Sequence, residues 1–436
     1  MTPPPDDSGR DVFRAPTGTH DVLPPDSGRW VEVVRRFAGR AQRSGYDLAV
    51  TPVFEHLEVF QRVGEATDVV RKEMYEFTDR GDRRIVLRPE STASVVRAFV
   101  QHRPPVPWKV WYLAPHFRYE RPQKGRYRQH HQLGVEALGT DDPALDVEVI
   151  ALAAGFLRDV GLTDLTLLLN SLGDEVCRPA YLDRLRDYLA EHEDALCADS
   201  QARYRENPLR VLDCKRPQCV EVTEKAPALF EHLCDPCRAH FERVQHGLDA
   251  LGVKYEIAPR LVRGLDYYTR TAFEFVSGAL DAAQSTVCGG GRYDRLAEEM
   301  GGPPTPGIGF GLGIERLLIV CDAEGVSLPT GRRLDAFVID AVGAEAGGAD
   351  PSIVVLDDLR QAGLAADRAY GGRSVKAQWK AADKSGARFG VMVAPDELTR
   401  GTLVVRDLAA GEQREVARDE VAGWIRTRLE ERGETR

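Results

Sequence analysis

Residues 117–136 read FRYERPQKGRYRQHHQLGVE. The first part of this stretch is crowded with cations beside a single acid, Glu120, and the second part is polar with few charges. The chain as a whole is acidic, with a formal net charge of -10 over 436 residues. A local basic cluster on an acidic protein indicates a site for a particular anion, not a surface that binds any polyanion. The cations of the cluster are Arg118, Arg121, Lys124, Arg126 and Arg128.

The segments 109–120 and 129–138 that flank this cluster both have the composition of strands. Pro122 and Gly125 lie between them, so the pattern predicts a long hairpin. Side chains alternate between the two faces of a strand, so every second residue points the same way. A solvated antiparallel sheet shows the same alternation, and the pattern alone leaves both interpretations open. The side chains that the hairpin is predicted to present together are Arg118, Glu120, Gln132 and Glu136.

Two downstream segments combine arginine with tyrosine or glycine. In LVRGLDYYTRTAFEF, 261–275, the guanidinium fork of Arg263 suits a phosphate and the hydroxyl of Tyr268 suits a ring nitrogen. A surface arginine beside core tyrosines would give the same letters. In TVCGGGRYDRL, 286–296, the glycine run lets a ligand approach the backbone closely, or simply forms a bend.

The segment TPGIGFGLGIERLL, 305–318, has glycine at every second position from 307 to 313. In a strand, this spacing leaves one face without side chains, so that a flat ring could lie against the backbone. Arg316 then falls in the first turn of the next helix, at the positive end of the helix dipole, where an anion would offset its charge. The dinucleotide-binding fingerprint is incomplete, because these glycines lie within the strand and no acid completes it downstream.

The segment RPESTAS, 88–94, places Glu90 and Thr92 on one face if it is extended. Glu90 could then hold a cationic amine, and Thr92 could supply a second polar contact. Ser91 or Thr92 could also cap the helix that ASVVRAFV predicts. The two interpretations are compatible.

The chain is long enough for two or three domains. Residues 1–12 are rich in proline and aspartate and are predicted to be disordered. Helical patterns dominate 142–160 and 175–250, whereas strands and helices alternate after Gly325 and predict a separate α/β unit of about 100 residues. No apolar run reaches the length of about 18 residues that a membrane span needs, and the first residues lack a signal-peptide pattern. We therefore expect a cytoplasmic protein without a membrane partner.

Eight cysteines occur in a chain for which no secretion signal is predicted, which favours thiols or metal ligands over disulfides. Four of them form two close pairs, a spacing that suits a structural Zn²⁺ site. Buried or merely reduced thiols remain an equal interpretation. The four cysteines of this hypothesis are Cys214, Cys219, Cys234 and Cys237.

Taken together and in this order, these motifs resemble those of the bacterial histidyl-tRNA synthetases, a family of class II aminoacyl-tRNA synthetases. RGLDYY is the most specific of them, and the resemblance extends from PTGTHDVLP near the start over about residues 14–430. It implies an α+β fold with an antiparallel-sheet catalytic domain at 13–325, a helical insertion at about 171–256 and an α/β anticodon-binding domain at 332–436. It also implies a homodimer formed through the first helix and the strand that contains Pro52.

The resemblance implies ATP-dependent ligation of L-histidine to tRNA(His) through a histidyl-adenylate, with Mg²⁺ on the ATP. The basic loop 121–128 would meet the acceptor end of the tRNA. His130 stands where the family has a phenylalanine that stacks on adenine, and Ser91 stands where it has glycine. Around histidine the resemblance implies Glu90, Thr92 and Gln132 at the amino group, Glu136 and Tyr268 at the imidazole nitrogens, and Tyr267 and Tyr293 lining the pocket. For ATP it implies Arg118 and Arg263 on the α-phosphate, Arg316 on the γ-phosphate and Glu120 on the adenine amino group.

Two other classes of protein share parts of this pattern. A non-catalytic regulatory paralogue that senses histidine would keep the catalytic fold and lose parts of the ATP site. An RNA-binding module would need the basic loop and the last domain but no pocket for imidazole. Because Arg118, Arg263 and Arg316 are all present and the last domain is complete, the sequence favours the enzyme.

Overall fold

The computed structural model divides the chain into two compact units, Met1–Thr330 and Gly331–Arg436. The predicted disordered segment 1–12 and Lys124 lie outside the residues that it describes. No helix in the described part of the chain is long and apolar enough to cross a membrane. The described residues are 13–64, 72–123, 125–280, 285–329, 334–343 and 350–433.

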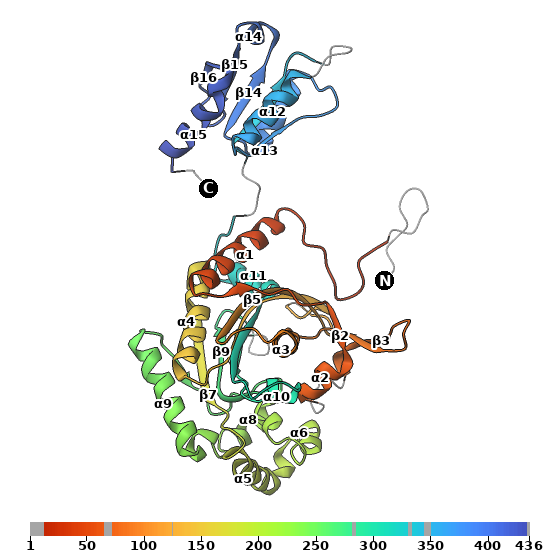
Figure 1. Cartoon of the computed structure of the whole chain (residues 1–436), viewed down its shortest axis with the longest axis vertical. Helices are drawn as coiled ribbons and strands as arrows, with labels where there is room; N and C mark the ends of the chain where they lie inside the picture. Colours follow the sequence, from red (N-terminus) through yellow and green to blue (C-terminus); the bar gives the residue numbers. More distant parts are fainter. Residues whose placement is uncertain are drawn as a thin grey trace. The chain divides into compact units, whose positions relative to one another are not determined.

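The first unit is built on an eight-stranded sheet with the order β1-β5-β6-β11-β10-β9-β7-β8 (Figure 1). Neighbours in the middle of the sheet are antiparallel, and only the terminal pairs β1/β5 and β7/β8 are parallel. The strands are β1 (Asp47–Leu48), β5 (Trp108–Phe117), β6 (Gln129–Leu138), β7 (Leu165–Ser171), β8 (Glu256–Ile257), β9 (Thr269–Ser277), β10 (Thr286–Arg292) and β11 (Gly307–Gly313).

The predicted hairpin is confirmed as β5 and β6, which pair along their whole lengths. The predicted strand 109–120 is too long, however, because β5 ends at Phe117. Arg118 and Glu120 therefore lie in the connecting loop. The loop stays attached because the Arg118 N–H donates to the Arg128 carbonyl at 2.9 Å. Along β6, Leu133 belongs to the apolar core and Glu136 on the opposite face is 1% exposed. The alternative of a solvated sheet is therefore wrong.

Glycines in β10 and β11 make room for charged side chains of the neighbouring strands. Gly309 pairs with Glu136, and a Cβ at Gly309 would collide with the Glu136 carboxylate. A Cβ at Gly289 would collide with the guanidinium of Arg263. The prediction that the glycines at 307–313 leave a bare face for a flat ring is therefore wrong at Gly309, where Glu136 fills the space, whereas Gly311 and Gly313 line a cavity.

One face of the sheet is covered by helices that enclose the apolar core. Phe37 of α1 lies 5.0 Å from Phe156 of α4 and 6.2 Å from Phe310 of β11, measured between ring centroids. The opposite face carries Glu136 and adjoins a small sheet of order β2-β4-β3. The helices of this unit outside the insertion are α1 (Asp26–Arg43), α2 (Leu57–Gly64), α3 (Thr92–His102), α4 (Pro143–Val160), α10 (Leu296–Glu299) and α11 (Ile314–Ala323). The strands of the small sheet are β2 (Phe54–His56), β3 (Tyr75–Thr78) and β4 (Arg84–Leu87).

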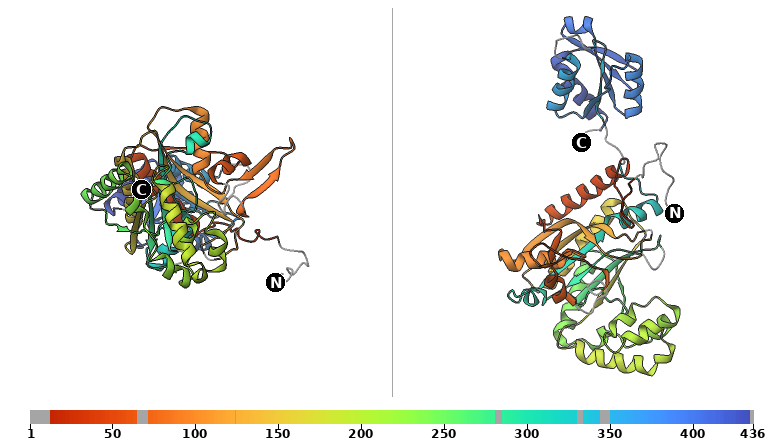
Figure 2. Two further views of the ribbon diagram at one scale, coloured as in Figure 1. Left: turned by 90° about the horizontal axis from the view of Figure 1, so that it is seen from below. Right: turned by 90° about the vertical axis from the view of Figure 1, so that its right-hand side faces the viewer.

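A helical insertion separates β7 from β8 and gathers at one end of the first unit, green in the right-hand view of Figure 2. A buried ion pair between Asp146 of α4 and Arg292 of β10 lies beneath it, with both side chains fully buried. His240 of α9 and Thr271 of β9 bond the same carboxylate at 2.8 and 2.6 Å, which ties the insertion to the sheet. The insertion comprises α5 (Arg178–Glu191), α6 (Ala198–Arg203), α7 (Leu209–Leu212), α8 (Pro217–Thr223) and α9 (Asp235–Ala250), with short 3₁₀ turns at Glu193–Ala195 and Leu229–His232.

The second unit has a five-stranded sheet of order β13-β12-β14-β15-β16. β12 is parallel to β13 and β14, and the last two strands are antiparallel. The predicted alternation of strands and helices is confirmed, although β16 was not predicted. The elements are β12 (Ala336–Asp340), α12 (Pro351–Gln361), β13 (Ala366–Arg368), α13 (Val375–Ser385), β14 (Phe389–Val393), α14 (Pro395–Thr399), β15 (Thr402–Asp407), β16 (Gln413–Ala417), a 3₁₀ turn (Arg418–Glu420) and α15 (Val421–Glu431).

Because this unit has its own apolar core, the fragment 331–436 is expected to fold alone and cooperatively. Phe389 is fully buried and packs edge-on against Trp424 at 5.6 Å. In that fragment, Phe389→Ala should lower the free energy of unfolding by about 3–5 kcal/mol, measured by urea denaturation. The control Ile353→Ala, at a side chain 53% exposed, should change it by less than about 0.5 kcal/mol. Equal effects of the two changes would contradict the described core.

Candidate active site

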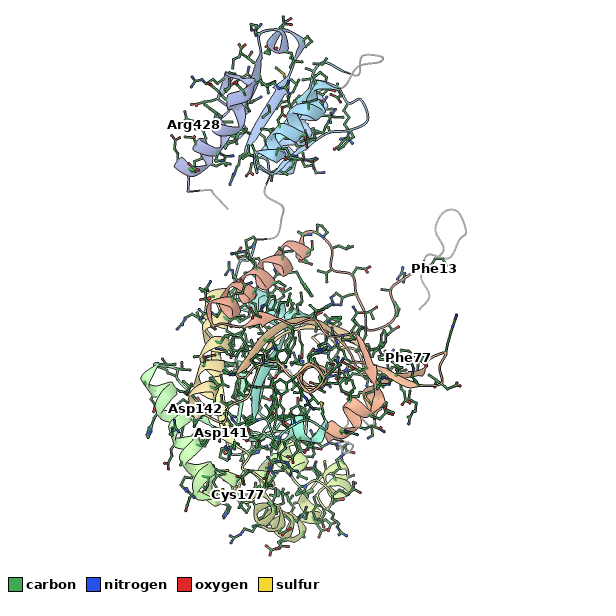
Figure 3. All side chains as sticks on the ribbon, in the orientation of Figure 1. Phe13, Phe77, Asp141, Asp142, Cys177 and Arg428 are labelled. Carbon is green, nitrogen blue, oxygen red and sulfur yellow. The ribbon has the colours of Figure 1, made fainter. Side chains whose placement is uncertain are left out.

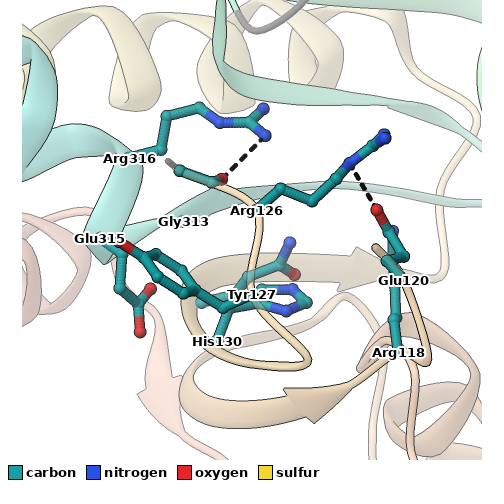
Figure 4. Close-up of a pocket in the computed structure, with 10 residues that line it drawn as sticks. Arg118, Glu120, Arg126, Tyr127, His130, Gly313, Glu315 and Arg316 are labelled. Carbon is teal, nitrogen blue, oxygen red and sulfur yellow. Dashed lines mark hydrogen bonds and ion pairs between the residues drawn. The ribbon is translucent and has the colours of Figure 1, made fainter. Parts of the chain in front are cut away.

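Two neighbouring cavities open at the Glu136 side of the sheet. The first, of about 210 Å³, lies between the hairpin loop and the start of α11 (Figure 4). The second, of about 270 Å³, lies over β10 and the segment around Arg263. Four residues line both cavities, so the two form one continuous site: Arg118, Gln132, Gly313 and Arg316.

Arginines from distant parts of the chain converge on this site, each fixed by a backbone carbonyl. The Arg118 Nε donates to the Pro89 carbonyl at 2.9 Å. The Arg316 Nη1 donates to the Thr286 carbonyl at 2.8 Å, and Arg316 lies in the first turn of α11 as predicted. Burial, and after it the charge of Arg126, lowers the pKa of Arg316. Cations held this close together repel one another, and an anion bound between them would relieve the repulsion.

Arg263 reaches the second cavity from the opposite side. Its guanidinium forms an ion pair with Glu274 and lies over the Tyr268 ring, 5.4 Å from the centroid. The Thr286 hydroxyl donates to the other oxygen of Glu274 at 2.9 Å, which fixes the carboxylate. Glu274 was not among the site residues predicted from the sequence. Its signal was a charged residue inside the otherwise apolar run AFEFV of β9.

The hairpin loop holds Glu120 at the edge of the first cavity. Glu120 forms an ion pair with Arg126, as the dashed line in Figure 4 shows. Arg128 lies over the Tyr119 ring, 4.1 Å from its centroid, which gives the loop a second fixed cation. Arg118 and Glu120 therefore reach the site as predicted, although from a loop.

His130 lines the first cavity and is held in its neutral form. Burial, and after it the charge of Arg118, lowers the pKa of His130 to about 3. A neutral imidazole presents a flat aromatic face without a charge that the neighbouring arginines would repel. The side chain is thus suited to stack on a planar ring.

Glu136 is a buried residue of β6, on the same face of the strand as Gln132, which lines both cavities. The Thr92 hydroxyl donates to its Oε1 at 2.7 Å and the Tyr293 hydroxyl donates to its Oε2 at 2.5 Å. Burial raises the pKa of the Glu136 carboxyl to about 8, although these two hydrogen bonds oppose the change. A buried carboxyl between two hydroxyls is a specific partner for a nitrogen that carries a proton.

Three buried tyrosines surround this carboxyl. Tyr267 lies 4.5 Å from Tyr268 and 5.9 Å from Tyr293 between ring centroids, and the second pair is edge-on. Burial raises the pKa of each phenol, so all three keep their protons and can donate hydrogen bonds at neutral pH. Tyr112 of β5, which the sequence analysis missed, lies against Gly134 on the same side and belongs to this group.

Glu90 caps helix α3. Its two carboxylate oxygens accept from the Thr92 N–H at 2.6 Å and the Ala93 N–H at 2.8 Å. The prediction that the hydroxyl of Ser91 or Thr92 caps this helix is wrong, because Ser91 bonds the His116 Nε2 at 2.7 Å and Thr92 bonds Glu136. The carboxylate at Glu90 supplies the cap instead.

Arg88 is a further residue that the sequence analysis missed. It is 4% exposed and donates to the carbonyls of Thr51, Pro52 and Pro115 at 2.9 to 3.2 Å. It thereby joins the Pro52 segment to the chain that carries Glu90. No pattern in the sequence distinguished this arginine from a surface one.

The predicted four-cysteine zinc site is wrong. Cys214 and Cys219 lie with Cys197, whereas Cys234 and Cys237 lie with Cys177 and Asp174, in a separate group. The two pairs separate because Cys219 is carried by α8, while Cys234 and Cys237 are at the start of α9. Spacing along the chain therefore did not report proximity in space.

The titration of Glu136 generates a prediction about stability. Its pKa rises from an ordinary 4.5 to about 8, so between these values the folded chain holds a proton that the unfolded chain releases. This contribution to stability is present below pH 4.5 and is lost as the pH rises towards 8. Glu136→Gln cannot titrate. Its free energy of unfolding minus that of the original chain should therefore increase by roughly 3 kcal/mol from pH 5 to pH 8, measured by urea denaturation.

The matched control is Glu242→Gln on the exposed face of α9. The same difference should stay constant with pH for this variant. A pH-independent difference for Glu136→Gln as well would show that the carboxyl is not buried as described.

Comparison with known proteins fits this geometry. A family model described as histidyl-tRNA synthetase matches residues 18–317, and an anticodon-binding-domain model matches 349–428. The histidine–tRNA ligase of Desulforamulus reducens is 49% identical over 417 residues, covering 95% of this chain and 99% of that protein. That of Anaeromyxobacter dehalogenans is 51% identical over 411 residues, covering 94% and 98%.

Among solved structures, apo histidyl-tRNA synthetase from S. aureus superposes with a TM-score of 0.79 at 36% identity. The match covers 95% of this chain and all of that one. Sequence and fold thus agree over both units. The chain belongs to the histidyl-tRNA synthetase family.

Proposed function

We propose that this chain is a histidine–tRNA ligase that activates L-histidine with ATP and transfers it to tRNA(His). The observation that carries the proposal is the buried Glu136 carboxyl, bonded by Thr92 and Tyr293, on the same strand as Gln132, which lines the cavities together with Arg118 and Arg316. One end of the site suits an imidazole and the other suits a polyphosphate. Family membership over nearly the whole chain supports the same activity.

We assign the histidine ring to Glu136 and Tyr268, which would each bond one imidazole nitrogen. Glu90, Thr92 and Gln132 would hold the α-amino group, since a carboxylate and two polar groups suit an ammonium ion. Tyr267 and Tyr293 would close the sides of the pocket. Glu90 already accepts two backbone N–H bonds, so its carboxylate is oriented before the amine arrives.

We assign the nucleotide to the arginine-lined cavities. Arg118 and Arg263 would contact the α-phosphate from opposite sides, and Arg316 would contact the γ-phosphate. Glu120 would accept from the adenine amino group once it separates from Arg126, and neutral His130 would stack on the base.

Mg²⁺ would enter with the polyphosphate and neutralise part of its charge. The carboxylates that line the two cavities in the described residues each have a partner. Glu120 pairs with Arg126, Glu274 pairs with Arg263, and Glu315 accepts from the His131 N–H at 3.0 Å. This donor set fits a metal ion held mainly by phosphate and water, not by a cage of protein carboxylates.

In the activation step the histidine carboxylate attacks the α-phosphorus of ATP and pyrophosphate leaves. Two anions must meet, so the residues would accelerate the step by aligning them and by stabilising the negative charge on the oxygens of the α-phosphate. Arg263 is suited to this because Glu274 and Tyr268 hold its guanidinium in place. In the second step a hydroxyl of the terminal tRNA ribose attacks the carbonyl of the adenylate, and AMP leaves. Neither step needs a protein nucleophile.

We propose that the two units divide the recognition of tRNA. Residues 13–325, with the insertion at about 171–256, would form the catalytic domain, and residues 332–436 would bind the anticodon, as the matching family model suggests. The hairpin loop 121–128 would meet the acceptor end through Arg121, Arg126 and Arg128. The protein would be located in the cytoplasm, where tRNA is aminoacylated.

A regulatory paralogue is the alternative function. The histidine–tRNA ligases reported above match this chain over more than nine tenths of its length, including the second unit, at 49% and 51% identity. The arginines of the nucleotide site are all present and each is held by a specific partner. Both observations favour the ligase.

We also propose a homodimer formed through the Pro52 segment. Leu48, Val50 and Phe54 are 56%, 83% and 57% exposed and lie on neighbouring stretches of chain. A run of exposed apolar side chains is typical of a protein interface. Arg88 joins this segment to the site, so the dimer would also support the segment that carries Glu90.

The proposed reaction predicts ATP–pyrophosphate exchange that requires histidine. Arg263→Ala should lower the exchange rate by about 10²–10³-fold, because it removes a fixed cation from the reacting phosphate. Arg243→Ala, at an exposed arginine of α9, is the matched control and should leave the rate unchanged. Folded protein that binds histidine but performs no exchange would reject the ligase and favour the regulatory function.

The proposed dimer predicts that Val50→Asp yields a monomer, because a charge cannot be buried in an apolar interface without a partner. Light scattering should give the mass of two chains for the original protein and of one chain for the variant. Leu251→Asp, an equally drastic change at an exposed residue at the end of α9, should remain dimeric. A monomeric original chain, or a dimeric Val50→Asp variant, would contradict this interface.

A further inference from the structure

The insertion contains two groups of cysteines outside the candidate active site. In the first, ligand atoms from Asp174, Cys177, Cys234 and Cys237 all lie within 4.8 Å of one another. Figure 3 labels Cys177, which lies just before α5. The second group has three members, and these are Cys197, Cys214 and Cys219.

We propose that the first group binds one Zn²⁺ through the thiolates of Cys177, Cys234 and Cys237 and the carboxylate of Asp174. In a tetrahedral site with bonds of about 2.3 Å to sulfur and about 2.0 Å to oxygen, sulfur and oxygen ligands lie about 3.5 Å apart. The Asp174 Oδ1 lies 3.4 Å from the Cys177 Sγ and 3.7 Å from the Cys234 Sγ. These two separations are close to those around a bound metal, and all four ligand atoms lie within 4.8 Å of one another.

The backbone supports thiolates at these positions. Cys177 and Cys234 stand at the N-caps of α5 and α9, and neither side chain bonds its own helix. The positive ends of two helix dipoles, of 14 and 16 residues, thus face the sulfurs. The Asp174 N–H also donates to the Cys177 Sγ at 3.4 Å.

The turn before Cys177 is shaped around its sulfur. Gly173 has a φ of +61°, and a Cβ there would lie 2.7 Å from the Cys177 Sγ. The Asp174 Oδ1 accepts from the N–H groups of Val176 and Cys177 at 3.0 and 3.2 Å, which fixes the carboxylate beside the sulfurs. A metal ion would therefore meet ligands that are already oriented.

Arg178 gives the site a neighbour of the right charge and a link to the rest of the molecule. Three thiolates and one carboxylate exceed the charge of Zn²⁺ by two, and the half-buried guanidinium of Arg178, next to Cys177 in the chain, would offset part of this excess. Arg178 also donates to the carbonyls of Leu172 and Tyr268 at 2.9 and 2.5 Å. The site would thus join the exit of β7, both ends of the insertion and the backbone of Tyr268.

The second group is less complete. Cys197 and Cys214 lie 3.9 Å apart between sulfurs, and the Ser200 hydroxyl lies 3.3 Å from Cys197 and 3.5 Å from Cys219. A structural zinc site uses four protein ligands of the cysteine, histidine or carboxylate kind. This group offers three and serves as the internal control.

Binding would release the protons of the three thiols to solvent and involves no change of oxidation state. The first test measures the metal in the full-length chain after loading with Zn²⁺ and removal of excess ion. We expect about one Zn²⁺ per chain, with an X-ray absorption spectrum that fits three sulfur ligands at about 2.3 Å and one oxygen at about 2.0 Å. No retained zinc, or a shell of four sulfurs, would overturn the proposal.

The second test assigns the ligands. Cys237→Ser should lose the zinc, whereas Cys219→Ser in the second group and Cys321→Ser at a buried cysteine outside both groups should retain it. Asp174→Asn is the milder variant, expected to fold and to release zinc to a chelator faster than the original chain. Loss of zinc from Cys219→Ser with retention in Cys237→Ser would contradict the assignment.

A third measurement rests on the proposed function. Because Arg178 holds the Tyr268 carbonyl, removal of zinc should raise the KM for histidine in pyrophosphate exchange more than the KM for ATP. Equal changes in both would remove the link to the histidine pocket. A zinc-loaded chain without any exchange would count against the ligase and leave the metal site intact, so the two failures are distinguishable.

Discussion

A carboxyl group buried in the middle of an antiparallel sheet is the constraint on which the rest of the site depends. Glu136 is 1% exposed, and burying an unpaired carboxylate would cost more free energy than the whole folding stability of a typical domain. The carboxyl is neutral because burial raises its pKa, and the hydroxyls of Thr92 and Tyr293 donate to its two oxygens. Gly309, which has no side chain, leaves space for it. A buried titratable carboxyl is unfavourable for stability. Its presence, with donors from Thr92 of α3 and from Tyr293 directly after β10, indicates a pocket that selects one small ring.

The cationic half of the site follows the opposite rule, because its charges stay ionised and are fixed from outside. Arg118 and Arg316 each use a backbone carbonyl, and Arg263 uses Glu274. Each guanidinium thus gives up some of its donors to hold its position and keeps others for a ligand. A site with neutral hydrogen-bonding groups at one end and fixed cations at the other suits the joining of an amino acid to a nucleotide.

Much of this arrangement was predictable where a local pattern carried the information. The alternation in 129–138 predicted β6 and its two faces, and the glycine spacing in 307–313 predicted β11 and the place of Arg316 at the start of α11. The periodicities of strands and helices depend on residues close together in the chain, so they can be predicted from the sequence.

What the sequence did not reveal depends on contacts between distant segments. Glu274 orients Arg263, and Arg88 holds the Pro52 segment, yet nothing within a few residues of either marks the role. The glycine face of 307–313 was interpreted as space for a ligand, although Glu136 fills the space at Gly309. The two cysteine pairs that spacing suggested as one site lie in two different groups, because the insertion carries them apart. One of these groups includes the carboxylate of Asp174, which a search for cysteines alone could not identify.

The most direct test of the account is the binding of each substrate to the Glu136→Gln variant, measured by calorimetry. The central claim is that this carboxyl selects the imidazole and takes no part in holding the nucleotide. We expect histidine affinity to fall by about 10- to 100-fold, the loss that follows when a buried hydrogen bond is broken and its partner is left unsatisfied, while ATP affinity stays the same. Equal weakening of both substrates, or unchanged binding of histidine, would contradict it.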